Sequence, residues 1–268
     1  MPEQRRTRKR LNLRKSLFVL PSLITLSSVF CGFDAIRVAS GATRAEDFNR
    51  AALLIIFAMF FDMLDGRVAR MTRTQSAFGL QLDSLADVVS FGVAPAVLMF
   101  NWSLKNQGSI GVLVSFLFVA AGVVRLARFN VLSMSDDGKP KKASKYFLGL
   151  PIPAAAGLIV SLVIANHGSS AQLQDPTYVW PMMGLTFLLA VLMISNVRFR
   201  SFKQVRMDLP TILLFMFVVG SSVGVGAGFG GTFVLFWLGC VYIAMGMIES
   251  VVGLPGKLRE RRKSIPPP

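Results

Sequence analysis

The chain has 268 residues, of which 53% are hydrophobic and only 16% are charged, and its mean hydropathy is +0.57. This composition excludes an ordinary soluble domain and predicts a polytopic membrane protein. The net charge of +15 does not require a nucleic-acid partner, because the positive-inside rule predicts the same excess of Lys and Arg in short loops between membrane spans. We therefore expect membrane lipid, and no nucleic acid, among its partners.

The chain begins with a basic cytoplasmic arm, residues 1–16, which contains seven Lys and Arg before the first apolar run. We expect the arm to be attracted to anionic lipid headgroups. Eight apolar stretches follow, each near the ~20 residues that a tilted membrane helix needs. They cover residues 17–39, 51–71, 88–104, 110–130, 147–166, 178–197, 210–227 and 232–252.

These stretches predict an all-α fold, a polytopic membrane helix bundle of about eight transmembrane helices. We expect a six-helix core over residues 17–197 and two additional transmembrane helices over residues 198–252. A basic cytoplasmic tail over residues 253–268 completes the predicted organisation.

The distribution of Lys and Arg predicts the orientation in the membrane. With the arm in the cytoplasm, 25 of the 29 Lys and Arg fall on the cytoplasmic side. The four on the other side are Arg37, Arg44, Arg50 and Lys105. This split supports an even number of spans with both termini in the cytoplasm, and we expect the plasma (inner) membrane of a prokaryote.

Four carboxylates, Asp62, Asp65, Asp83 and Asp87, stand within or between two strongly apolar stretches. A carboxylate at membrane depth costs roughly 2.5 to 3.5 kcal/mol on insertion scales, so their presence predicts a functional site. Spacings of three and four residues place each pair on one face of a helix. The predicted topology places all four toward the cytoplasm, between two neighbouring helices.

Two pairs of carboxylates on adjacent helices can build an all-oxygen site for Mg²⁺ or Mn²⁺. Two such ions about 3.5–4 Å apart are a known device for displacement at phosphorus, so we expect two. The small residues Gly66, Ala69 and Gly79 leave room for a ligand beside the backbone. Arg67 and Arg70 add positive charge for a phosphate, although Arg67 also fits an ordinary loop cation.

These residues resemble the signature of the CDP-alcohol phosphotransferases at every fixed position. The matching positions are Asp62, Asp65, Gly66, Ala69, Arg70, Gly79, Asp83 and Asp87. The resemblance implies the fold of that family, and an enzyme that transfers a phosphatidyl group from CDP-diacylglycerol to an alcohol and releases CMP.

The resemblance also implies a role for each residue. Asp62, Asp65 and Asp83 would hold metal, and Asp87 would complete the second metal site and act as general base on the acceptor hydroxyl. The residues implied to surround the CDP moiety are Asp62, Asp65, Gly66, Ala69, Arg70, Gly79 and Asp83. A carboxylate beside a divalent metal can take a proton from a hydroxyl that the metal has acidified, which agrees with this assignment.

Outside the signature the chain resembles the integral-membrane phosphatidylserine synthases. The similar segments are residues 21–28, 30–33, 125–130 and 149–157. The resemblance implies L-serine as the acceptor and a homodimer as the assembly. One departure is Ser22, where that family usually has asparagine.

A site for serine should offer a cation to its carboxylate and polar groups nearby. Arg125 and Arg128, three residues apart at the cytoplasmic end of a predicted span, can supply the cation, with Asn130 as a polar neighbour. The alternative is a basic cluster that reaches to headgroups. Glycerol 3-phosphate or inositol phosphate would suit the same arginines, so these acceptors stay open.

A cation-coupled transporter is the alternative from another functional class, with the carboxylates as ion ligands along a path. That interpretation requires carboxylates near the middle of the membrane and two related halves of the chain. The carboxylates cluster toward one surface and no repeat is visible in the sequence, so both features favour the enzyme.

Overall fold

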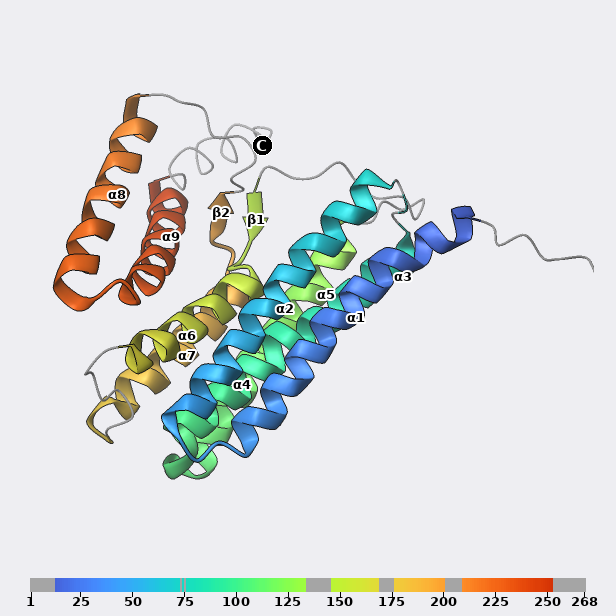
Figure 1. Ribbon diagram of the computed structural model, residues 1–268. Helices are drawn as coiled ribbons and strands as arrows, with labels where there is room; N and C mark the ends of the chain where they lie inside the picture. The colour runs from blue at the N-terminus through green and yellow to red at the C-terminus, as the bar shows by residue number, and fades with distance from the viewer. Residues whose placement is uncertain are drawn as a thin grey trace, which may run out of the picture.

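The computed structural model describes residues 13–72, 74, 76–133, 146–168, 176–200 and 209–252. The predicted basic tail and most of the basic arm lie outside these residues. The helices are α1 (Leu13–Ser40), α2 (Ala45–Met71), α3 (Ala77–Asp87), α4 (Ala94–Met99), α5 (Ser109–Ser133), α6 (Ile152–His167), α7 (Val179–Ile194), α8 (Leu209–Phe229) and α9 (Phe233–Val252). Strands β1 (Tyr146–Leu148) and β2 (Arg198–Arg200) add a short antiparallel ribbon. The predicted all-α helix bundle is confirmed (Figure 1).

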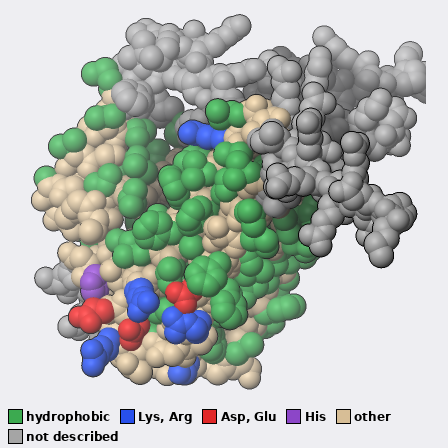
Figure 2. All heavy atoms as spheres, turned by 45° about the vertical axis from the view of Figure 1, so that its right-hand side comes forward, with side chains coloured by type: hydrophobic (Ala, Val, Ile, Leu, Met, Phe, Trp, Pro, Cys, Tyr) green, Lys and Arg blue, Asp and Glu red, His purple; other side chains and the backbone are tan. Residues whose placement is uncertain are grey.

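Three helical stretches among the described residues are long and apolar enough to cross a membrane: Leu20–Ser40, Ala77–Gln107 and Ser109–Leu132. Four shorter apolar helices accompany them: Ile152–His167, Val179–Ile194, Val218–Phe229 and Phe233–Ile248. Figure 2 shows a broad hydrophobic surface on which charged side chains gather toward one end. Such an exposed apolar surface is what a bilayer covers.

The third predicted span is part of a longer helical rod. It begins with α3 and continues through two π-helical segments, η1 (Val88–Val93) and η2 (Phe100–Leu104), with α4 between them, and ends in the short 3₁₀ turn η3 (Lys105–Gln107). The hydroxyl of Ser76 accepts a hydrogen bond of 3.0 Å from the Gly79 N–H and caps the start of α3. The rod therefore starts before the predicted boundary at residue 88 and includes two of the aspartates.

The predicted start of the fifth span at residue 147 was wrong. Residues 146–148 form β1, and α6 begins only at Ile152, directly after Pro151. Proline favours an extended residue before it and suits the start of a helix rather than its interior. Gly149 makes the turn with a φ of 78°, and its N–H donates to the Val197 carbonyl at 2.9 Å.

Hydroxyl groups tie α1 to α2 and to η1 where the three segments cross. Ser28 Oγ donates to the Ala58 carbonyl at 3.0 Å, and Ser90 Oγ donates to the Ser28 carbonyl at 3.0 Å. A Cβ at Gly32 would lie 2.7 Å from Ser90 Oγ, so only glycine permits this approach. Buried hydroxyls and small residues are the usual means of close helix packing in membranes. They fix the relative position of the two helices that carry the aspartates.

Helices α8 and α9 form a hairpin beside α6 and the ribbon (Figure 1). The hairpin docks through α9, because α9 contacts both α6 and β2. Phe199 of β2 is fully buried, and its ring lies 5.6 Å from the ring of Tyr242 on α9. The ribbon thus joins the hairpin to the rest of the bundle.

Candidate active site

The aspartates of α2 and α3 meet at one place. Asp62, Asp65 and Asp83 each offer a carboxylate oxygen, and these three oxygens all lie within 4.8 Å of one another. Asp65 is buried, with 4% of its surface exposed, and Asp62 and Asp83 are half-buried. The predicted convergence of the two helix faces is therefore correct.

Asp87 belongs to the same cluster. Its carboxyl is within hydrogen-bonding reach of Asp62, and it interacts electrostatically with both Asp62 and Asp83. Asp87 lies one turn of α3 after Asp83 and is therefore further from the start of the rod. All four predicted carboxylates are thus brought together.

The cluster fits a divalent cation. Among the described residues, Asp65 Oδ2 and Asp87 Oδ1 are buried and have no hydrogen-bond partner. Buried carboxylate oxygens without a partner are costly, and so are several negative charges side by side. A hard cation bound by these oxygens offsets both costs, and an all-carboxylate donor set is the one that such cations prefer.

Helix α1 completes the cluster with a residue that had no predicted role. The hydroxyl of Thr25 is within hydrogen-bonding reach of Asp65 and also lies 3.0 Å from the Pro21 carbonyl. Thr25 is buried, and its one hydroxyl hydrogen is donated to the Pro21 carbonyl, so it would have to turn from that carbonyl to donate to the Asp65 carboxylate. The only signal in the sequence is a hydroxyl one turn after a proline in an apolar span.

The small residues of the signature lie beside the carboxylates. Gly66 follows Asp65, and a Cβ at Gly66 would meet only the far end of the Arg70 side chain, at 3.5 Å. Gly79 lies one turn before Asp83 in the capped first turn of α3. Ala69 is half-buried and Arg70 is exposed. The end of α2 and the start of α3 therefore have little side-chain bulk next to the cluster.

The predicted acceptor residues lie in three different environments. Arg125 of α5 is buried, 7% exposed, and interacts electrostatically with Asp87. Arg128 points to the end of α7, where its Nη2 donates to Asn196 Oδ1 at 2.7 Å and its Nη1 to the Ile194 carbonyl at 3.4 Å. Asn130 Nδ2 donates to Ser84 Oγ at 2.9 Å. Arg125 is within electrostatic range of Asp87, Asn130 joins α5 to α3, and Arg128 holds α5 to α7.

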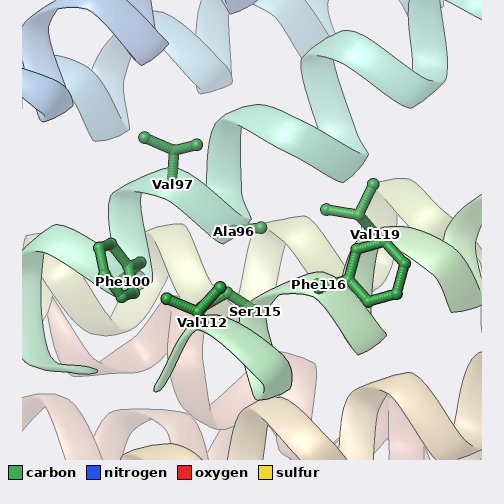
Figure 3. A pocket seen from close by; sticks show the side chains of 7 residues that line it. All are labelled: Ala96, Val97, Phe100, Val112, Ser115, Phe116 and Val119. Atoms are coloured by element: carbon green, nitrogen blue, oxygen red, sulfur yellow. The ribbon is translucent and has the colours of Figure 1, made fainter. Parts of the chain in front are cut away.

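An apolar hollow of about 240 Å³ lies elsewhere, between α4–η2 and α5 (Figure 3). Its lining residues are Ala96, Val97, Phe100, Val112, Ser115, Phe116 and Val119. Ser115 donates its hydroxyl to the Gly111 carbonyl at 2.9 Å, so it offers no hydrogen to a ligand. This hollow suits hydrocarbon and is separate from the carboxylate cluster.

The fold and the carboxylate cluster define a class of protein. Residues 18–195, more than half of the chain, match the CDP-alcohol phosphatidyltransferase family, and the chain belongs to this family. The chain is an integral membrane protein, and members of this family generally use a divalent metal.

Three relatives of this chain, from different organisms, share the same name. The chain is 41% identical over 204 residues to the CDP-diacylglycerol–serine O-phosphatidyltransferase of Helicobacter pylori, covering 74% of this chain and 78% of that protein. Its identity to the protein of that name from Saccharomyces cerevisiae is 42% over 144 residues, covering 52% and 51%. The protein of that name from Methanocaldococcus jannaschii is 29% identical over 239 residues, covering 89% of this chain and 98% of the relative. An alignment over 89% of this chain extends beyond residue 195, so the similarity reaches into the α8–α9 hairpin.

Proposed function

We propose that the protein transfers the phosphatidyl group of CDP-diacylglycerol to the hydroxyl of L-serine, which gives phosphatidylserine and CMP. The observation that carries the proposal is the convergence of Asp62, Asp65, Asp83 and Asp87 beside the buried Arg125. The relatives named for this reaction support serine as the acceptor. The same chemistry with glycerol 3-phosphate or inositol phosphate is the alternative.

The proposal includes two divalent ions, Mg²⁺ or Mn²⁺, held by Asp62, Asp65 and Asp83 with Asp87 completing the second site. When bound, such ions neutralise phosphate charge and lower the pKa of a nearby hydroxyl. Thr25 lies within hydrogen-bonding reach of Asp65, and by turning its hydroxyl from the Pro21 carbonyl it could support this carboxylate when it binds metal. Without cations, the partnerless oxygens of Asp65 and Asp87 would leave the cluster electrostatically unfavourable.

The chemical step that we propose is a direct displacement at phosphorus. Asp87 accepts the proton of the serine hydroxyl, and the hydroxyl oxygen forms a bond to the phosphorus that carries diacylglycerol. The bond from that phosphorus to the CMP oxygen breaks, and CMP leaves with the electron pair. No covalent enzyme intermediate is needed, because acceptor and donor meet at one cluster.

The residues that we propose around the CDP moiety are Asp62, Asp65, Gly66, Ala69, Arg70, Gly79 and Asp83. At Gly66 an added Cβ would meet only the end of the Arg70 side chain, whereas at Gly79 it would lie 3.2 Å from Ser76 Oγ, and the exposed Arg70 can meet a phosphate from the surface. The acyl chains of the donor would stay in the bilayer, alongside the hydrophobic surface of the bundle.

For serine we propose Arg125 as the cation that pairs with the carboxylate. Arg125 is buried and within electrostatic range of Asp87, so an acceptor held between the two would have its hydroxyl near the proposed base. Arg128 and Asn130 are the further candidates at the same end of α5. Their contacts with Asn196 and Ser84 place them at the edge of this region.

We also propose the setting of the reaction. The charge distribution supports an orientation with the site and both termini facing the cytoplasm, and the membrane that we propose is the inner membrane of a prokaryote. Residues 17–197 would form the catalytic core, residues 198–252 an added helix pair, and the basic arm and tail surface anchors. A homodimer is the assembly that the family resemblance supports.

The test is CMP release by purified protein in detergent with CDP-diacylglycerol and Mn²⁺ or Mg²⁺. Serine, glycerol 3-phosphate and inositol phosphate are supplied separately. We expect release with serine alone. Release only with a phosphorylated acceptor would replace serine, and no release with any of the three would contradict the proposed enzyme.

A further inference from the structure

Helix α1 holds both aspartate-bearing segments through two buried serines. Ser28 of α1 donates its hydroxyl to the Ala58 carbonyl of α2 at 3.0 Å, and Ser90 of η1 donates its hydroxyl to the Ser28 carbonyl at 3.0 Å. Ser28 is 1% exposed and Ser90 is fully buried, so solvent does not compete for these hydrogen bonds. The function proposed above gives neither serine a role.

Both hydrogen bonds lie within one helical turn of an aspartate of the cluster. Ala58 stands four residues before Asp62 in α2, and an α-helical carbonyl accepts the N–H of the residue four positions later. The carbonyl that binds the Ser28 hydroxyl is therefore also the helical partner of the Asp62 N–H. Ser90 stands three residues after Asp87, where the rod changes from α3 to η1.

The relative position of the two segments matters because the cluster is divided between them. Asp62 and Asp65 come from α2 and Asp83 from α3, and one oxygen of each lies within 4.8 Å of the others. A small divalent ion such as Mg²⁺ requires its oxygen ligands at about 2.0–2.1 Å in a near-ideal geometry. A small displacement of α2 relative to the rod would therefore remove one set of carboxylates from the ion.

The close approach of α1 and η1 requires glycine at position 32. A Cβ at Gly32 would lie 2.7 Å from Ser90 Oγ and 2.8 Å from Ser90 Cα, and the backbone atom cannot rotate out of the way as a side chain can. Gly32 follows Ser28 by four residues, so both lie on the same face of α1. Gly32 thus sets how close α1 and η1 come, and the serine hydroxyls hold them there.

We infer that Ser28 and Ser90 are positioning residues that set the separation of α2 from the rod, and thereby the affinity of the carboxylate cluster for a divalent cation. The inference rests on the proposed metal site. It goes beyond that proposal because it assigns part of the metal affinity to residues of α1 and η1 that bind no ion. Substitutions outside the cluster should then weaken metal binding while every carboxylate stays in the chain.

The test measures Mn²⁺ binding to the full-length protein in detergent, without substrates, from the electron paramagnetic resonance signal of free Mn²⁺. The variants are Ser28→Ala, Ser90→Ala and both together. We expect the Mn²⁺ dissociation constant to rise about three- to tenfold in each single variant, with the KM for serine nearly unchanged at saturating Mn²⁺. In the double variant the second substitution should add little, because the two hydrogen bonds form one series from α2 to η1.

Ser27→Ala is the matched control. Ser27 is the neighbour of Ser28, but its hydroxyl donates within α1, to the Leu23 carbonyl at 3.0 Å, and this hydrogen bond is exposed. We expect Ser27→Ala to bind Mn²⁺ as the wild type does. Gly32→Ala is an independent variant, because it keeps both hydroxyls and pushes η1 away from α1, and it should weaken Mn²⁺ binding at least as much as either serine variant.

The outcomes separate the inference from the proposed function. Serine variants that lose thermal stability but bind Mn²⁺ with wild-type affinity would overturn the positioning role and leave the proposed function intact. Independent effects of the two substitutions in the double variant would also overturn it. Absence of Mn²⁺ binding to the wild type would contradict the proposed metal site and overturn the inference with it.

Discussion

The two sides of the site are assembled in different ways. On one side, the spacing within α2 and α3 places each pair of carboxylates on one helix face, and only five residues separate the two helices in the chain. On the other side, Arg125 and Asn130 of α5 approach the cluster only because α5 packs against the rod, as the hydrogen bond of 2.9 Å from Asn130 Nδ2 to Ser84 Oγ shows. The comparison indicates that local spacing carries the chemistry, whereas tertiary packing carries acceptor recognition. Substitutions on the carboxylate side should therefore affect turnover, and substitutions on the α5 side should affect acceptor binding.

Metal removal should have the largest effect, because it acts on the carboxylate side as a whole. We expect chelation by EDTA to reduce CMP release to background with every acceptor, and Mn²⁺ or Mg²⁺ to restore it. The reason is that the clustered carboxylates of Asp62, Asp65 and Asp83 cannot bind a phosphate without cations between them. Full turnover after exhaustive chelation would remove metal from the proposal.

Asp87→Asn should rank second. We expect turnover to fall by about 10² to 10⁴, the usual contribution of a general base, while binding of CDP-diacylglycerol is largely kept. CMP release and nucleotide-lipid binding are measured on the same preparation. Asp34→Asn is the control, since Asp34 forms a surface ion pair with Arg37 at 2.7 Å and should not affect turnover. Near-normal turnover of Asp87→Asn would exclude the base role.

Substitutions of the two arginines of α5 test the acceptor side of the site. We expect Arg125→Lys to raise the KM for serine about tenfold, because lysine cannot present a planar fork of donors. Arg128→Lys should mainly lower the stability, by about 1 kcal/mol, because it weakens the hydrogen bonds to Asn196 and Ile194. Kinetics and thermal unfolding of both variants are compared. A larger increase in KM for Arg128→Lys would move the serine site toward α7.

Gly246→Ala should have the smallest effect on turnover. The added methyl meets the Phe199 ring, so α9 has to shift, at a cost of about 1–3 kcal/mol in stability and with little change in turnover. Gly220→Ala on α8 is the matched control, because nothing lies within 4 Å of its added Cβ. Thermal unfolding in detergent and serine titration measure both effects. Identical behaviour of the two variants would mean that the docking of α9 does not matter.

Much of this organisation could be predicted from the sequence. Apolar runs near twenty residues indicate the helices, and the spacing of Asp62, Asp65, Asp83 and Asp87 indicates their convergence. Both signals are local, so they need no knowledge of which helices pack together. The predicted helix boundaries are wrong where a turn interrupts an apolar run, as it does before Pro151.

The parts that could not be predicted depend on contacts between distant segments. Nothing near Arg128 in the sequence indicates that its partner is Asn196. The ribbon that buries Phe199 consists of two three-residue strands, too short to produce a recognisable alternation. Tyr242 looks like one more residue of an apolar span until α9 is placed against β2.

The π-helical segment η1 starts directly after Asp87 and contains Ser90 and Gly92. A π turn holds more residues than an α turn, so it rotates the following helix relative to the preceding one. The edge of α3 that carries Asp83 and Asp87 and the edge of α4 that faces the core are thereby set independently along one rod. Deletion of a single residue within Val88–Val93 would remove this extra rotation between α3 and α4. Either the aspartates of α3 or the core residues of α4 would then point away from their present neighbours. The length of this segment is therefore as strict a requirement as the identity of the aspartates.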